Sequence, residues 1–272
     1  MRFALLAGAH ATDFVVIGGL NPDLLAPDSP VPHQGTTDVD LLFELGFVYD
    51  REELDFGWLD DVLHAGDFVE SRRFAGWQWY GILGATRVRL DLLCDVADNP
   101  GQAIHMPGAT NAAAQNLEGP AAALHQPVTR SLEVPAALRA SSSAVPEQVK
   151  LRFASLGGYI AAKSAALLTR GLDKDAYDLM FVIMYAPGGP RSAAAAALDV
   201  QVPPGRRSVS ETIGPAVQRF VDRTGDWTTI VVGQLFAAGD DSDEDQLRAD
   251  VSVAASRFLQ VLRSEVAQPG AE

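Results

Sequence analysis

Two aspartates separated by one residue, Asp38 and Asp40, are the side chains whose spacing points most directly to chemistry. They lie at the start of an apolar run that predicts a β-strand over residues 39–45, and side chains two apart in a strand share a face. Neighbouring carboxylates repel each other unless a cation bridges them, and carboxylate oxygens are ligands that Mg²⁺ prefers. Asp91, in a strand-like run over residues 87–96, is placed to add a third carboxylate from a neighbouring strand. Three carboxylates around one or two metal ions suit an in-line phosphoryl or nucleotidyl displacement.

A pair of glycines, Gly18 and Gly19, directly follows the buried-strand pattern of residues 14–17. Glycine lets the backbone approach a phosphate closely and turn N–H groups toward it. The pair belongs neither to a Walker loop nor to a Gly-x-Gly-x-x-Gly fingerprint, because the residues that complete those motifs are absent. Together with the aspartates it predicts a phosphate and metal site. The competing interpretation is turn chemistry beside a solvated strand end.

Two basic residues, Lys163 and Arg170, lie two helical turns apart and therefore on one helical face. Of the 21 basic residues, 18 are arginines and three are lysines, and Lys174 is another of those lysines. A compact ammonium can approach a triphosphate oxygen as a point charge, which favours a nucleotide contact at these positions. The alternative is an ordinary helix surface on which Lys174 and Asp178 form an i,i+4 ion pair.

Composition describes a globular protein of 272 residues, 47% hydrophobic, with room for one large domain or two modest ones. A net charge of −14 argues against a general nucleic-acid binder but leaves room for a local phosphate site. The single cysteine, Cys94, excludes an internal disulfide framework and suits the reducing cytoplasm. No run is long enough for a membrane helix, so we expect a soluble, cytoplasmic protein without a membrane partner.

The hydrophobic pattern changes along the chain from mixed to helical. Strands are predicted over residues 14–17, 39–45, 68–74, 77–83 and 87–96, with a helix over 54–64. Helices are predicted over residues 156–169, 176–185, 211–223, 227–237 and 245–266. The proline-rich interval 22–37 predicts an irregular loop in which His33 is solvated, and residues 97–127 predict connecting structure. A serine run at 141–143 predicts a boundary between domains 1–140 and 141–272.

Two passages of the sequence together resemble the AbiEii/AbiGii-type nucleotidyltransferase family, known mostly as toxins of bacterial toxin–antitoxin and phage-defence systems. The first is Val-Val-Ile-Gly-Gly-Leu at 15–20, continued by Thr-Thr-Asp-Val-Asp-Leu at 36–41. The second runs from 163 to 179 and contains the more specific pattern Lys-x-x-Ala-x-x-x-Arg…Lys-Asp-x-Tyr-Asp-Leu. The resemblance covers roughly residues 14–185. It implies an α+β fold, in which a mixed-sheet nucleotidyltransferase core of the polymerase-β type packs against a helical C-terminal half.

The resemblance also implies roles for individual residues, with Mg²⁺ as cofactor and an NTP as substrate. It places the metal at Asp38 and Asp40, Lys163 on the triphosphate, and Asp175 or Asp178 in the acidic position of the last motif. The residues expected to act in catalysis are Asp38, Asp40, Asp91, Lys163 and Asp175. Those expected to bind the nucleotide are Gly18, Gly19, Thr36, Lys163, Arg170, Lys174 and Asp178. The expected metal ligands are Asp38, Asp40 and Asp91.

The expected activity is NTP-dependent transfer of a nucleotide to an RNA end, such as that of a tRNA, or to a protein hydroxyl, with a cognate antitoxin protein as partner. This sequence departs from the family in two places. The interval from Gly19 to Asp38 is longer than in many members, and Gln34 and Gly35 stand where the family often has an arginine. Two alternatives therefore stay open: a small-molecule nucleotidyltransferase, or a degenerate member that only binds a nucleotide or a partner protein.

Overall fold

The computed structural model describes residues 1–46, 51–139, 145–201 and 207–266. Its contacts divide the chain into two compact units: unit 1 is Met1–Gly18 and Thr37–Ala154, and unit 2 is Gly19–Thr36 and Ser155–Glu272. This division differs from the boundary at residue 140 expected from sequence. Strand β9 (Gln148–Phe153) pairs with the first strand of the sheet, and the segment Gly19–Thr36 groups with the helices.

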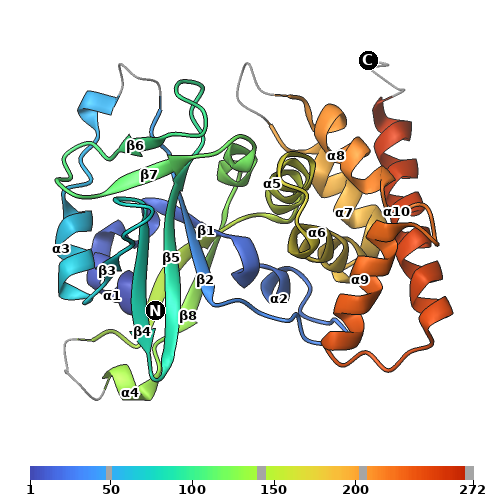
Figure 1. Cartoon of the computed structure of the whole chain (residues 1–272), viewed down its shortest axis with the longest axis horizontal. Helices are drawn as coiled ribbons and strands as arrows, with labels where there is room; N and C mark the ends of the chain where they lie inside the picture. The colour runs from blue at the N-terminus through green and yellow to red at the C-terminus, as the bar shows by residue number, and fades with distance from the viewer. Residues whose placement is uncertain (47–50, 140–144, 202–206, 267–272) are drawn as a thin grey trace. The chain divides into compact units, whose positions relative to one another are not determined.

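Unit 1 is built on a mixed sheet in which the described residues supply nine strands (Figure 1). The strands are β1 Phe14–Ile17, β2 Asp38–Phe43, β3 Val69–Glu70, β4 Gln78–Leu83, β5 Thr86–Cys94, β6 Ala103–His105, β7 Ala113–Asn116, β8 Val128–Glu133 and β9. The main order is β3-β4-β5-β2-β1-β9-β8, and β7 pairs with both β5 and β6. β2 and β5 run parallel, as do β1 and β9 and β5 and β7, whereas the remaining pairs are antiparallel.

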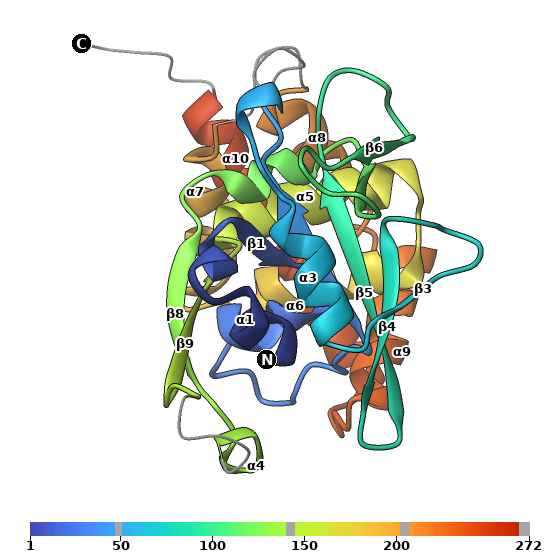
Figure 2. The ribbon, with the colours of Figure 1, turned by 90° about the vertical axis from the view of Figure 1, so that its left-hand side faces the viewer.

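One face of this sheet is closed by aromatic packing. Phe14 on β1 is the register partner of Phe43 on β2, so both side chains point to the same side. Phe3 from helix α1 (Arg2–Ala7) packs edge-on against Phe14, with ring centroids 5.6 Å apart. Helix α3 (Trp58–Ala65) lies beside α1 (Figure 2). Because strand side chains alternate, the residues between these aromatics face the other way.

The opposite face is apolar at one end and polar at the other. Val15 and Leu42 are register partners on this face and are fully buried, and the short helix η4 (Pro120–Leu124) contacts both of their strands. Two residues nearer the start of β2, the partners are Ile17 and Asp40. The polar end of this face therefore carries the aspartates that the sequence singled out.

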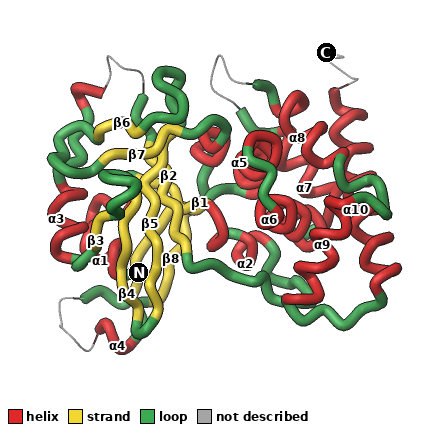
Figure 3. The backbone as a smooth tube through the Cα atoms, viewed as in Figure 1, coloured by secondary structure: helices red, strands yellow, loops and turns green. Residues whose placement is uncertain are grey.

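Unit 2 is helical (Figure 3). Its described helices are α2 Pro22–Leu25, α5 Leu156–Thr169, α6 Asp173–Tyr185, α7 Gly189–Leu198, α8 Val209–Gln218, α9 Asp226–Ala237 and α10 Glu244–Val266. Helix α6 is the centre of this unit, since it contacts α2, α5, α7, α9 and α10 and is buried along most of its length. Phe181, Phe220 and Phe258 are fully buried in this core. Helices α5 and α8 begin with side-chain caps, from Ser155 on α5 and from a Ser208–Glu211 capping box on α8.

The remaining short elements are the 3-10 helices η1 Gly8–Thr12, η2 Gly18–Leu20 and η3 Arg51–Glu53, and helix α4 Ala136–Arg139. The α+β class is confirmed, with a mixed sheet in one unit and helices in the other. Within the described ranges, no helix combines the length and the apolar character that crossing a membrane requires.

Candidate active site

The aspartates of unit 1 meet on one face of the sheet because β2 and β5 are parallel neighbours in a fixed register. Asp40 is the register partner of Asp91, and Asp38 is the partner of Arg89. Residues 38 and 40 alternate with buried core residues, as do 89 and 91, so all four side chains project to the polar end of the same face. Asp91 is buried, with 7% of its surface exposed, whereas Asp38 and Asp40 are half-buried. The arrangement follows from the two-residue alternation of side chains along a strand, which is also the pattern that predicted it.

Arg89 lies among these carboxylates. Its Nη2 donates to Asp38 Oδ2 at 2.8 Å, and its Nε lies 3.2 Å from Asp91 Oδ2. Across the described part of the chain, no three carboxylate, imidazole or thiol side chains are arranged as a ready-made metal site. Arg89 was not singled out from sequence, although the same two-residue alternation on β5 would have placed it beside Asp91.

Gly18 lies directly against the second aspartate. Its φ of +76° is in the left-handed region, which favours glycine, and a Cβ added there would overlap the carboxylate of Asp40. Two independent constraints, backbone conformation and close approach, therefore require glycine at the end of β1. The predicted proximity of the glycine turn to the aspartates holds for Gly18 and Asp40.

Asp91 has an unusual environment for a carboxyl group. Its pKa is raised from 3.8 to about 6, chiefly by burial; Asp40 and Asp38 also raise it, whereas Arg89 and Gln78 lower it. Gln78 Nε2 donates to Asp91 Oδ1 at 3.2 Å, and Tyr80 Oη donates to Gln78 Oε1 at 2.9 Å. Burial is the main reason for this shift, and the neighbouring carboxylates add to it. Carboxylate oxygens are ligands of the kind that Mg²⁺ prefers.

In unit 2, the second glycine lies beside a lysine. Lys174 Nζ donates to Thr36 Oγ1 at 2.9 Å. A Cβ added at Gly19 would lie 2.8 Å from Thr36 Cβ and 3.1 Å from Lys174 Nζ, so only glycine leaves room for this approach. Three of the residues expected to bind the nucleotide are thus brought together, and Lys174 is exposed among them.

Lys163 is buried, with 7% of its surface exposed, and ion-paired inside unit 2. Its Nζ lies 2.7 Å from Asp178 Oδ2 and 3.1 Å from Asp175 Oδ1, and Arg170 makes two further hydrogen bonds to Asp175 at 2.7 and 2.8 Å. Burial alone would raise the pKa of Asp178, but Lys163 and His33 outweigh it and lower that pKa to about 2. The alternative of an ordinary helix surface is wrong for Lys163, and Asp178 pairs with Lys163 rather than with Lys174.

The expectation that His33 is a solvated loop residue is also wrong. Its ring is buried and stacks on Tyr177, with centroids 4.9 Å apart, while Phe181 meets it edge-on. His33 Nε2 lies 2.8 Å from Asp178 Oδ1. Its ring is buried because Tyr177 and Phe181 on α6 cover it and Asp178 provides a hydrogen-bond partner for its Nε2. Nothing local in the sequence links positions 145 residues apart.

Gln34 occupies the region where the family often has an arginine. Its Nε2 donates to the backbone oxygen of Gln234 on α9 at 2.7 Å. Gln34 is therefore engaged in holding the segment Gly19–Thr36 to the helical core, and it does not replace an arginine as a cation.

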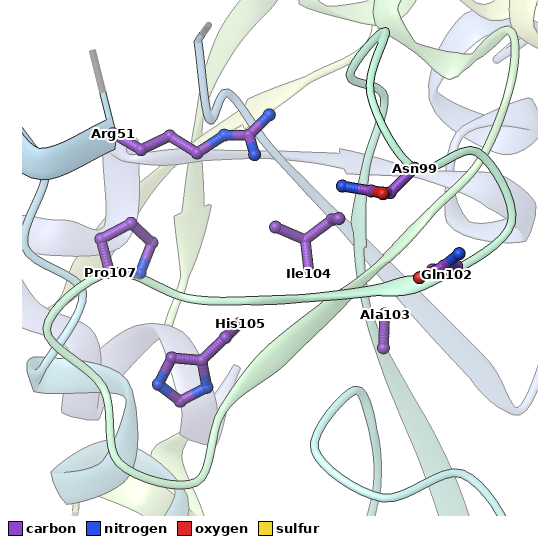
Figure 4. A pocket seen from close by; sticks show the side chains of 7 residues that line it. All are labelled: Arg51, Asn99, Gln102, Ala103, Ile104, His105 and Pro107. Carbon is purple, nitrogen blue, oxygen red and sulfur yellow. The ribbon is translucent and has the colours of Figure 1, made fainter. Parts of the chain in front are cut away.

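Unit 1 also contains a cavity of about 430 Å³ beside strand β6 (Figure 4). Its polar lining residues are Arg51, Asn99, Gln102 and His105. Arg51 is already neutralised, because two of its guanidinium nitrogens donate to Asp98 at 2.6 and 3.0 Å. None of the residues expected to act in catalysis or nucleotide binding lines this cavity.

Comparison with known proteins adds little to this description. No protein-family model and no curated protein sequence matches the chain. Among solved structures, JHP933 from Helicobacter pylori is similar at 13% identity and a TM-score of 0.44, over 98% of this chain and 92% of that protein. A second H. pylori protein, described as a candidate nucleotidyltransferase, is similar at 13% identity and a TM-score of 0.43, over 99% and 95% of the two chains. Both TM-scores are below 0.5.

Proposed function

We propose that this protein is a Mg²⁺-dependent nucleotidyltransferase that moves a nucleoside monophosphate from an NTP to an acceptor hydroxyl. The observation that carries the proposal is the register of β2 and β5, which sets Asp40 beside Asp91 on a polar sheet face with Gly18 against Asp40. Carboxylates clustered on one face next to a glycine turn supply the two things this reaction needs. These are a divalent-cation site and a backbone that a phosphate can approach.

In this proposal Asp38, Asp40 and Asp91 hold the metal. The bound ion would neutralise charge on the phosphates and align the α-phosphate for in-line attack. As an alternative to binding the metal, Asp91 would help to activate the acceptor hydroxyl. Arg89, which is paired with Asp38 and Asp91, is a further cation that would contact a phosphate oxygen of the substrate.

The cations proposed for the triphosphate lie in unit 2 and differ in their surroundings. Lys174 is exposed beside Gly19 and Thr36, so it can meet a phosphate without breaking a buried ion pair. Lys163 is paired with two buried aspartates, and removing it from them would leave buried charge uncompensated. We assign the direct contact chiefly to Lys174 and propose that Lys163 acts on the nucleotide while still held by Asp178.

The proposal is tested by following the α- and γ-phosphates separately. The protein is incubated with Mg²⁺ and each of the four NTPs, labelled at either position, together with total RNA, a protein extract or a set of small hydroxyl compounds. We expect α-label on one class of acceptor, release of pyrophosphate and no transfer of γ-label. Asp40→Asn should lose at least about 100-fold in rate, the scale of losing one essential catalytic group. Glu133→Gln, which also changes a strand carboxylate, is the matched control and should be within twofold of wild type.

The class of acceptor that is labelled separates the variants of this function. Label on RNA or on protein agrees with the toxin role that the family resemblance suggests, and label on a small compound supports the small-molecule alternative. Transfer of γ-label, or transfer that survives Asp40→Asn, would contradict the proposal. The antitoxin partner is a further part of the toxin role, and expression of the chain alone should then arrest growth in an Asp40-dependent manner.

The second candidate function is nucleotide binding without catalysis. Two observations favour it: Arg89 is ion-paired with Asp38 and Asp91, and Gln34 stands in the region of the family's arginine. A binding-only protein would bind NTP but label no acceptor, and Asp40→Asn would leave its affinity unchanged. The labelling experiment and a binding measurement on the same variant therefore distinguish the two functions.

A further inference from the structure

His33 joins the long segment Gly19–Thr36 to helix α6 through a set of polar contacts. Its backbone N–H donates to Asp23 Oδ1 at 3.0 Å, and its Nε2 lies 2.8 Å from Asp178 Oδ1. Its Nδ1 accepts a hydrogen bond from the backbone N–H of Gly35 at 3.2 Å. Both ring nitrogens are therefore engaged, one with α6 and one with the turn that leads to Thr36.

These partners determine the protonation state of the ring. An imidazole nitrogen that accepts from a backbone N–H carries no proton, so the proton must be on Nε2, where it is donated to Asp178. His33 is thus neutral in this arrangement. A second proton would put an N–H group opposite the N–H of Gly35 and remove that hydrogen bond.

The ring of His33 lies beside a cluster of paired charges. The cluster contains two cations and two anions: Lys163, Arg170, Asp175 and Asp178. Asp178 links the two parts, since one of its oxygens faces His33 and the other faces Lys163. The other titratable groups that face His33 are Asp23 on α2 and Tyr177 on α6.

We propose that His33 is a positioning residue for nucleotide binding. Through Asp178 it fixes the ammonium of Lys163, and through Gly35 it fixes the backbone that presents Thr36 to Lys174. Loss of these contacts would weaken NTP binding. This inference rests on the proposed function, because it assumes that these lysines serve a nucleotide.

Two substitutions separate the hydrogen bond from the packing. His33→Gln keeps an N–H donor that can reach Asp178 but does not titrate. His33→Phe keeps an aromatic ring against Tyr177 but leaves an oxygen of Asp178 without its donor. If His33 acts by positioning Asp178, glutamine should rescue and phenylalanine should not. If the ring serves only as packing, the order should be reversed.

The test measures the dissociation constant of a non-reacting NTP analogue with Mg²⁺, by calorimetry, for the three full-length proteins at pH 7.5. We expect His33→Phe to weaken binding at least tenfold and His33→Gln to remain within threefold of wild type. The comparison of wild type with glutamine needs no folded phenylalanine variant.

Other outcomes would overturn the inference. Wild-type affinity in a folded His33→Phe protein, or a tenfold loss of affinity in a folded His33→Gln protein, would show that His33 does not position the site through its hydrogen bonds. Hydrogen exchange of residues 19–36 separates this failure from failure of the proposed function. If wild type binds no NTP while His33→Phe increases exchange in that segment, the anchoring role stands but the nucleotide role of both proposals is lost.

Discussion

Without metal, replacing Asp91 by asparagine should make the fold more stable at neutral pH, because it removes a charge that the folded state disfavours. Burial and the neighbouring carboxylates raise the pKa of Asp91 from 3.8 to about 6. At about 1.4 kcal/mol per pKa unit, ionising this group costs the folded state about 3 kcal/mol at pH 7.5. This is an upper value, since asparagine matches the protonated acid in shape but lacks its O–H donor.

The sign follows from the direction of the shift. A carboxyl whose pKa is raised on folding binds its proton more tightly in the folded state. Its neutral form therefore favours the fold fully below about pH 4, and this advantage is lost as pH rises through about 6. The stability difference between Asp91→Asn and wild type should accordingly be about half its full size at pH 5 and reach its plateau above about pH 7.

Urea unfolding in the presence of EDTA measures this difference. Three of the four tryptophans, Trp58, Trp77 and Trp79, lie in unit 1, so fluorescence follows the unit that contains Asp91. Mg²⁺ should then stabilise wild type more than the asparagine variant, because only wild type retains the third carboxylate. A variant that is less stable than wild type at pH 7.5 in EDTA, or a difference that does not change with pH, would refute this account of Asp91.

Two further predictions use matched pairs. Gly18→Ala should lower the free energy of unfolding by about 1–3 kcal/mol more than Gly84→Ala does, and it should abolish nucleotide transfer. Both glycines have positive φ, but only at Gly18 would a methyl group overlap Asp40. Equal losses of stability for the two variants in urea unfolding would contradict this. Lys163→Ala should cost about 3–5 kcal/mol by leaving two buried aspartates without their ammonium, whereas Lys174→Ala should change stability by less than about 1 kcal/mol and weaken NTP binding. Calorimetric NTP affinity and urea unfolding of both lysine variants check this, and an unchanged stability of Lys163→Ala would show that its burial is not structural.

The carboxylate face could be predicted from sequence because two-residue alternation decides it. Once residues 38–43 and 86–94 form strands, Asp38, Asp40 and Asp91 each have a fixed side, and parallel pairing of the two strands brings those sides together. Arg89 follows from the same rule, since it lies on β5 two residues before Asp91. Local pattern is sufficient here since each side chain's direction is a local property.

Strand β9 and helix α7 were not predicted, because the serine, glycine and proline residues near them indicated a boundary more strongly than the hydrophobic pattern indicated a strand or helix. Strand β9 has an alternating burial pattern over residues 148–153, but a serine run and a proline before it suggested a change to helices. Helix α7 begins directly after Gly188, in a Pro-Gly-Gly-Pro sequence, and Pro190 is at its first turn, where proline is tolerated. Such residues indicate that one element ends, but they do not indicate whether a strand or a helix follows.

The contacts of His33 could not be predicted, because they depend on tertiary structure. An imidazole in a proline-rich loop has no sequence feature that assigns it to an aspartate on a distant helix. The burial of Lys163 is a similar case, since its helix is apolar nearly all round and only packing decides which faces are covered. Polar pairs between residues far apart in the sequence can be identified only when the fold is known.

The central claim is that the aspartate face binds a divalent cation, and Mn²⁺ titration by electron paramagnetic resonance tests it most directly. The measurement compares wild type, Asp40→Asn and the control Glu133→Gln, each with a non-reacting NTP analogue. We predict that wild type and Glu133→Gln bind Mn²⁺ with the same affinity and that Asp40→Asn binds it at least tenfold more weakly. Equal Mn²⁺ affinity in wild type and Asp40→Asn would contradict the claim.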